Sequence, residues 1–148
     1  MNNNDAKEKI LLTQWQVCVE MANAISQRRD TMNNIFMTVN LAIMAALSIV
    51  WDIKSILLLT SGMVVCILWL LFIRNYKQLN SAKFEIVNKI ENDLSFQPFK
   101  EEWIILKTNK TYINGTTLEK SLPIMFIVLY IIAIIITITI KLQTGEHK

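Results

Sequence analysis

The sequence has few of the residues on which catalysis, metal binding and phosphate binding usually depend. Its 148 residues include one His, two Cys, three Gly and two Pro. The cysteines, Cys18 and Cys66, and His147 lie far apart, so they give neither metal-ligand spacing nor a pattern typical of Cys/His or Ser/His/Asp catalysis. Three glycines are too few for a Gly-rich phosphate-binding loop. The sequence therefore disfavours an enzyme, a cofactor and a metal site.

Charged residues are also scarce, at 18% of the chain, whereas 53% of the residues are hydrophobic and the mean hydropathy is +0.36. Three uncharged runs, at 31–51, 55–73 and 121–140, are each close to the roughly 20 residues that a membrane-spanning helix needs, and we place the third span at 121–141, with Lys141 at its end. A soluble protein of this length has too little polar cover for three helices that are apolar all round. These runs predict three transmembrane helices.

The distribution of basic residues predicts the orientation of these spans. Lys and Arg concentrate in the segments 1–30 and 74–120, and only Lys54, Lys141 and Lys148 lie in the other flanks. Because basic flanks stay in the cytoplasm, we expect the N-terminus and segment 74–120 to be inside. The hairpin 52–54 and the tail 142–148 are then on the outer side of this membrane.

The segment 1–30 is expected to be an amphipathic cytoplasmic helix that runs unbroken into the first span. Asp5 and Glu8 resemble a helix N-cap with its reciprocal acid, and no Pro or Gly follows until Gly62. Apolar and small residues then recur at spacings of three and four, namely Leu11, Trp15, Cys18, Ala22, Ile25, Met32, Phe36, Val39 and Ile43. This heptad seam indicates packing against the chain's own second cytoplasmic segment, against neighbouring subunits, or both.

The segment 74–120 is predicted to continue the second helix beyond the membrane and then to form a short third helix. Its apolar stripe is Tyr76, Leu79, Phe84, Val87, Ile90 and Leu94. Pro98 suits the first turn of a short helix, with Glu101 and Glu102 at its positive end. Thr116 and Glu119 resemble a capping box before the last span, and Pro123 is expected in the first turn of that span.

No Asp, Glu, Lys, Arg or His lies inside the predicted spans, which disfavours a pump or an ion-coupled carrier. Three amides, Asn33, Asn34 and Asn40, are the candidates for interhelical or axis-facing polar residues. A buried amide in lipid needs a partner, so helix packing is one interpretation and a pore lining is the other. A single stripe contains Asn33, Met37, Asn40, Met44 and Leu47.

Arg28 and Arg29 lie beside the first span, where they are candidates for contact with anionic lipid heads or simply fix the topology. Basic and acidic residues alternate between positions 77 and 120, so the cytoplasmic segments present no basic stripe. We therefore expect membrane lipids as partners and no nucleic acid.

A spread of short matches over residues 11–130 resembles the RipA family of octameric bacterial membrane proteins. The resembling residues are Arg28, Arg29, Asn34, Phe36, Asn40, Trp69, Arg74, Asn75, Tyr76, Leu79, Asn80, Lys83, Phe84, Ile90, Glu91, Pro98, Phe99, Glu102, Trp103, Leu118, Glu119 and Pro123. The resemblance implies a bacterial cytoplasmic (inner) membrane and an eight-fold homo-oligomer, and it implies no reaction.

With this resemblance, several polar and aromatic residues become candidates for a cytoplasmic contact layer. They are Trp15, Arg74, Tyr76, Asn80, Lys83, Glu91, Glu102 and Trp103. Amphipathic side chains of this kind pack while their polar ends stay hydrogen-bonded. They represent either a folding core or a site for a ligand or signal.

The sequence thus predicts an all-α integral membrane protein, with three transmembrane helices, two of which extend into a helical cytoplasmic collar, assembled as a homo-oligomeric ring. The favoured function is a non-enzymatic scaffold or interaction platform, and the alternative is a gated channel formed by the same ring. Eight helices about 9 Å apart enclose an opening of roughly 13 to 15 Å. We expect a first-helix lining rich in Met, Leu and Ala to hold lipid or to stay dewetted.

Overall fold

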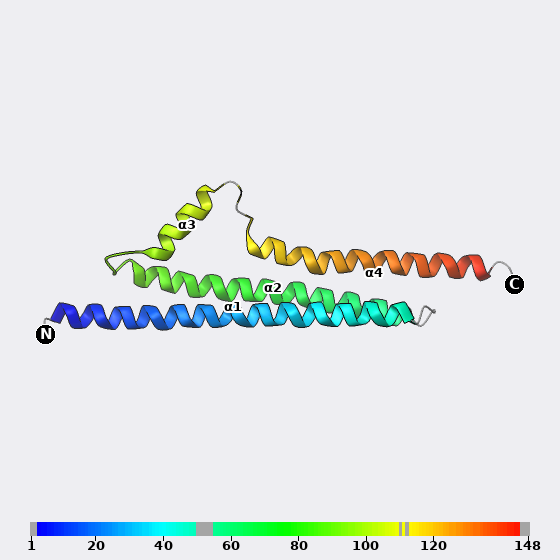
Figure 1. Cartoon of the computed structure of the whole chain (residues 1–148), viewed down its shortest axis with the longest axis horizontal. Helices are drawn as coiled ribbons and strands as arrows, with labels where there is room; N and C mark the ends of the chain where they lie inside the picture. Colours follow the sequence, from blue (N-terminus) through cyan, green and yellow to red (C-terminus); the bar gives the residue numbers. More distant parts are fainter. Residues whose placement is uncertain (1–2, 50–54, 110, 112, 146–148) are drawn as a thin grey trace. The chain divides into compact units, whose positions relative to one another are not determined.

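A computed structural model describes residues 3–49, 55–109, 111 and 113–145 (Figure 1). The chain forms four helices, α1 (Asn3–Ile49), α2 (Ser55–Glu91), α3 (Pro98–Thr108) and α4 (Gly115–Gly145). The described residues contain no strand. The predicted all-α fold is therefore confirmed.

Three of the helices are long and apolar enough to cross a membrane, over Asp5–Ile49, Ser55–Glu91 and Gly115–Gln143. This agrees with the three predicted spans. The expected external hairpin 52–54 lies outside the described residues, as do residues 146–148 of the expected tail. Residues 142–145 of that tail belong to α4, because no Gly or Pro lies between Pro123 and Gly145.

The chain divides into two compact units. The charged unit comprises Met1–Asp30 and Asn75–Asn114, and the apolar unit comprises Thr31–Arg74 and Gly115–Lys148. Most of the charged residues belong to the charged unit. Arg74 and the residues 115–120, which the sequence assigned to the cytoplasmic segment, belong to the apolar unit.

Helices α1 and α2 are long because the sequence offers nothing to interrupt them. α1 has 47 residues without Gly or Pro, and α2 has 37 residues with Gly62 as its single Gly. A core of the apolar unit forms where buried residues recur at spacings of three and four along α2, with Gly62 between Leu59 and Cys66. Its buried members are Leu47 from α1, Leu59, Cys66, Trp69 and Ile73 from α2, and Phe126 and Tyr130 from α4.

The seam of α1 shifts by one residue within the apolar unit. Val39, which the heptad pattern placed in the seam, is exposed, and Asn40 is fully buried. A straight helix has 3.6 residues per turn, so a strict seven-residue repeat drifts by about 20° per heptad. Over the length of α1 this drift moves the buried position from Val39 to Asn40.

Three predicted helix boundaries were wrong. α1 begins at Asn3, so Asp5 lies in its first turn and is not the N-cap. α2 ends at Glu91, before Leu94. α4 begins at Gly115, so Pro123 lies inside the helix and cannot donate a backbone hydrogen bond to the carbonyl of Glu119. In contrast, Pro98 occupies the first turn of α3 as predicted.

Candidate functional site

The apolar unit contains a buried polar cluster around Asn40, which we call the amide cluster. Its members are Asn40 of α1, Cys66 of α2 and Tyr130 of α4, and each of them is fully buried. The Tyr130 hydroxyl donates to Asn40 Oδ1 at 2.9 Å, and the Cys66 thiol donates to the same oxygen at 3.1 Å. The Asn40 amide nitrogen donates to the Phe36 carbonyl at 2.8 Å. One amide thereby links three helices.

Gly62 explains how a tyrosine fits at this position. A Cβ atom placed on Gly62 would lie 2.4 Å from Cζ of Tyr130, well inside van der Waals contact. The missing side chain therefore makes room for the phenol ring against the backbone of α2. This close approach lets the Tyr130 hydroxyl reach Asn40, which would otherwise be a buried amide in an apolar environment.

A second interhelical hydrogen bond lies along the same unit. The Trp69 indole nitrogen donates to Asn33 Oδ1 at 2.8 Å. The Trp69 ring stacks on Phe36, with centroids 5.8 Å apart and planes 9° apart, and lies 6.4 Å from the Phe126 ring. Together with the bond from Cys66 to Asn40, the bond from Trp69 to Asn33 shows that α1 and α2 run antiparallel in this unit.

The stripe that the sequence proposed as a pore lining faces the interior of the chain. Asn40 and Leu47 are buried, and Met37 and Met44 pack against the core of the apolar unit. Asn33 is half-buried with Trp69 as its partner. These side chains stabilise the protomer itself. Asn34 differs from them because its side chain is exposed.

Several exposed hydroxyl groups of the apolar unit bond to their own helices. Thr38 donates to the Asn34 carbonyl at 2.8 Å, and Thr139 donates to the Ile135 carbonyl at 2.9 Å. Thr60 and Ser61 likewise donate to carbonyls one turn earlier in α2. A hydroxyl satisfied in this way tolerates an apolar neighbour, whether lipid or another helix.

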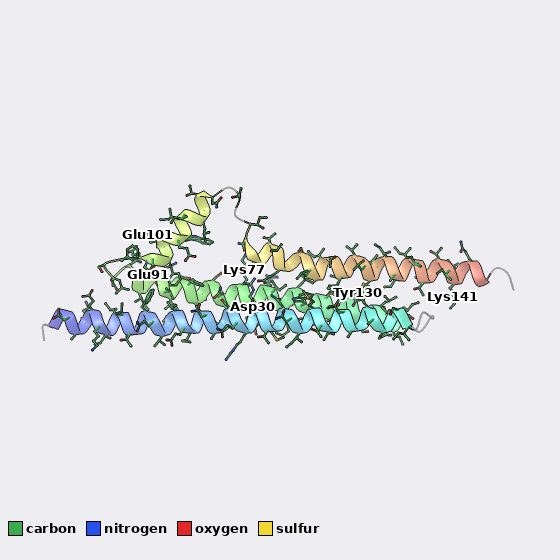
Figure 2. The ribbon with its side chains drawn as sticks, in the orientation of Figure 1. Asp30, Lys77, Glu91, Glu101, Tyr130 and Lys141 are labelled. Atoms are coloured by element: carbon green, nitrogen blue, oxygen red, sulfur yellow. The ribbon has the colours of Figure 1, made fainter. Side chains whose placement is uncertain are left out.

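In the charged unit, the carboxylate of Glu91 holds the beginning of α3, and we call this arrangement the Glu91 clasp. Glu91 is fully buried at the end of α2 (Figure 2). Its Oε1 accepts from the Phe99 backbone N–H at 3.3 Å, and its Oε2 accepts from the Lys100 backbone N–H at 3.4 Å. Gln97, the N-cap residue, makes no side-chain capping bond. Glu91 therefore supplies the acceptors that a capping side chain normally provides.

A third donor reaches Glu91 from α1, because the Trp15 indole nitrogen bonds to Oε1 at 3.2 Å. Phe99 completes the packing, with its ring 5.8 Å from the Trp15 ring and 5.5 Å from the Phe84 ring. The positive end of the α3 dipole and three N–H groups compensate for burying the carboxylate. By contrast, Glu85 is fully exposed, and a hydrogen bond from Lys89 lowers its pKa.

The structure divides the predicted cytoplasmic contact residues. It brings Trp15 and Glu91 together, whereas Glu102 is exposed and Trp103 is about half exposed, with the Lys107 ammonium 5.4 Å from its ring centroid. Tyr76, Asn80 and Lys83 are half-buried on α2, and Arg74 is exposed in the apolar unit.

Asn80 is the one half-buried residue whose side-chain oxygen, Oδ1, is enclosed with no hydrogen-bond partner among the described residues. Arg28 is exposed, and Arg29 is half-buried with an interaction of its own. In the part of the chain that the structure describes, no group of three His, Cys, Asp or Glu residues could hold a metal ion.

Sequence reasoning missed the role of Tyr130 and Gly62. Tyr130 is the one tyrosine inside the third predicted span, and Gly62 is the one glycine in α2. A lone phenol and a lone glycine in two spans are a signal for a small-to-large helix contact. Pairing them with Asn40 requires the register of three helices, which the sequence pattern does not supply.

A comparison with known families matches residues 12–139 to the octameric membrane protein family (8xMP). The match covers most of the chain. The chain belongs to this family. Comparison with curated proteins and with solved structures found no match.

Membership of the 8xMP family fits the three apolar helices and makes the chain a membrane protein of a family described as octameric. The amide cluster and the Glu91 clasp are then features within one protomer of such a protein. Both consist of hydrogen bonds between helices of a single copy.

Proposed function

We propose that this 8xMP chain is a non-enzymatic scaffold that assembles as an octameric ring in the bacterial cytoplasmic membrane. The N-terminus and the charged unit face the cytoplasm, where the charged unit forms a helical platform, and the C-terminus is outside. Within the family, we infer that the chain is related to the RipA proteins. The family's description as octameric and the positions of the Lys and Arg residues support this proposal.

The observation that carries the scaffold role is the inward direction of the polar side chains. Asn33 and Asn40 bond to Trp69, Cys66 and Tyr130 within the protomer. Exposed hydroxyls bond to backbone carbonyls, which leaves an apolar surface toward lipid and neighbouring copies. A conducting pore generally needs polar or charged groups along its wall. This arrangement supports assembly over conduction.

A channel is the second candidate, because an eight-fold ring encloses an axial opening if one helix of each copy lines it. Asn34, whose side chain is exposed, is the amide available for such a lining.

Ion flux through reconstituted vesicles tests the choice. We expect purified octamers in vesicles to release no more dye or ion than empty vesicles, with rings still visible by electron microscopy. Saturable or selective currents that Asn34→Leu changes, without loss of rings, would establish the channel instead. The same flux measurement on Asn40→Leu is the control, because Asn40 lies in the core of the protomer. It shows how much flux changes when a substitution affects the folding of the protomer.

A further inference from the structure

The charged unit contains an antiparallel helix pair whose inner seam is already filled. The chain leaves this unit at Asp30 and returns at Asn75, and Trp15 bonds to Glu91, so the two helices run in opposite directions. Ala22, Ile25 and Val87 are buried in the seam between them.

A second apolar stripe precedes the seam by one residue on each helix. On α1 it contains Ile10, Val17 and Met21, which precede the seam residues Leu11, Cys18 and Ala22. On α2 it contains Leu79 and Ile86, which precede Asn80 and Val87. These five side chains are between 44% and 59% exposed.

Helix geometry places both stripes on one side of the pair. Successive residues of an α-helix are turned by about 100°. When two helices run antiparallel and face each other, the positions just before the seam fall on the same flank of both helices. The five residues Ile10, Val17, Met21, Leu79 and Ile86 therefore form one surface, which we call the hairpin face.

Helix α3 lies on the opposite flank. Phe84 and Glu91 follow the seam positions of α2 by one residue, and both contact Phe99 at the beginning of α3. α3 has no buried residue, and its apolar side chains Trp103, Ile104 and Ile105 are between 49% and 69% exposed. Trp103 and Ile105 point about 200° apart, so only Ile104 and Ile105 share the side of α3 that is turned away from Phe99. We call these two residues the α3 face.

A ring of identical copies requires this kind of arrangement. Around a ring of more than two copies, each copy must use two different surfaces, because every contact is head-to-tail. The hairpin face and the α3 face are exposed apolar surfaces on opposite flanks of a unit that holds most of the charged residues. Exposed apolar side chains that gather on one side of a polar unit indicate protein contacts.

We propose that the hairpin face of one copy binds the α3 face of the next copy around the ring, so that the partner of each surface is a second copy of this chain. The inference rests on the octameric assembly in the proposed function. It assigns α3 a role as the element that joins neighbouring protomers, and it makes the Glu91 clasp the anchor that holds α3 in place for this contact.

Disulfide cross-linking in native membranes tests the pairing. In a Cys18→Ala background, Val17→Cys combined with Ile105→Cys should give, on oxidation, a ladder of linked species that extends to eight copies. Each substitution alone should give no ladder. Co-expression of the two singly substituted chains should give linked dimers, which shows that the bond joins different chains. The matched control is Asn23→Cys with Ile105→Cys, because Asn23 is exposed on α1 and is turned about 120° from Val17 and about 160° from Met21, away from the hairpin face.

The outcomes separate this inference from the proposed function. A ladder with Val17→Cys and none with Asn23→Cys supports the pairing. Three outcomes would overturn the pairing: ladders of equal extent from the test and control pairs, a disulfide within one chain, or an octamer that is intact by native mass spectrometry but forms no link. Each of them would leave the ring standing. A monomer in the unsubstituted protein would remove the ring itself. Met21→Cys with Ile105→Cys repeats the test at a second position in case Val17→Cys lowers the yield.

Discussion

The hydrogen bond between Tyr130 and Asn40 should make a measurable contribution to the stability of the protomer. The two side chains are fully buried and their oxygens are 2.9 Å apart. Interhelical hydrogen bonds in membrane proteins contribute about 0.6 kcal/mol on average and up to about 1.7 kcal/mol. The Tyr130 hydroxyl also lies 3.5 Å from the Asn40 backbone carbonyl, an acceptor that survives side-chain truncation. We therefore expect a coupling energy of about 0.6 to 1.5 kcal/mol.

A double-mutant cycle measures this coupling. The free energy of unfolding is determined in mixed micelles for the wild type, Asn40→Ala, Tyr130→Phe and the double variant, with helicity as the signal. The cavity left by Asn40→Ala appears in both arms of the cycle and cancels. A control cycle pairs Asn40→Ala with Thr60→Val, because the Thr60 hydroxyl bonds to its own helix. If the Tyr130 cycle gives no more coupling than the Thr60 cycle, the amide cluster does not join the helices.

Three further outcomes are expected. Gly62→Ala should destabilise the protomer by about 1 to 3 kcal/mol in the same unfolding assay, because its Cβ overlaps the Tyr130 ring, and unchanged stability would argue against the close approach. Glu91→Ala should speed amide hydrogen exchange in the first turn of α3, because the partly buried N–H groups of Phe99 and Lys100 lose their acceptor, a loss of about 1 kcal/mol, whereas exchange equal to the wild type would rule out the clasp. Lys89→Ala should raise the pKa of Glu85, measured by NMR titration. Because the pKa of Glu85 is lower in the folded state, ionised Glu85 favours folding at pH values above its unfolded-state pKa, and this contribution is lost as the pH falls through the folded-state pKa. An unchanged pKa of Glu85 in Lys89→Ala would mean that Lys89 is not the cause.

Local sequence features predict the helices well. The absence of Gly and Pro from α1 predicts one continuous helix, and Pro98 predicts the beginning of α3. Long uncharged runs predict the three candidate spans. These features depend on residues close together in the chain, so local chemistry decides them. Pro123 shows the limit, because the helix begins before it in spite of the missing N–H.

The contacts between helices depend on register over long separations, and they could not be predicted in the same way. The heptad pattern placed Val39 in the seam, but the drift of a straight helix buries Asn40 instead. The pattern also gave Asn40 no partner, because Tyr130 lies 90 residues away. For Glu91, the sequence indicated a contact residue, and only the fold shows that it caps α3.

Native mass spectrometry of the purified protein in a mild detergent tests the central claim most directly, namely that membrane-spanning copies of this chain assemble into a closed ring. The account predicts one dominant species with the mass of eight 17.1 kDa chains, with or without retained lipid. A monomer as the dominant species, under conditions in which the helicity and the amide cluster are intact, would contradict it.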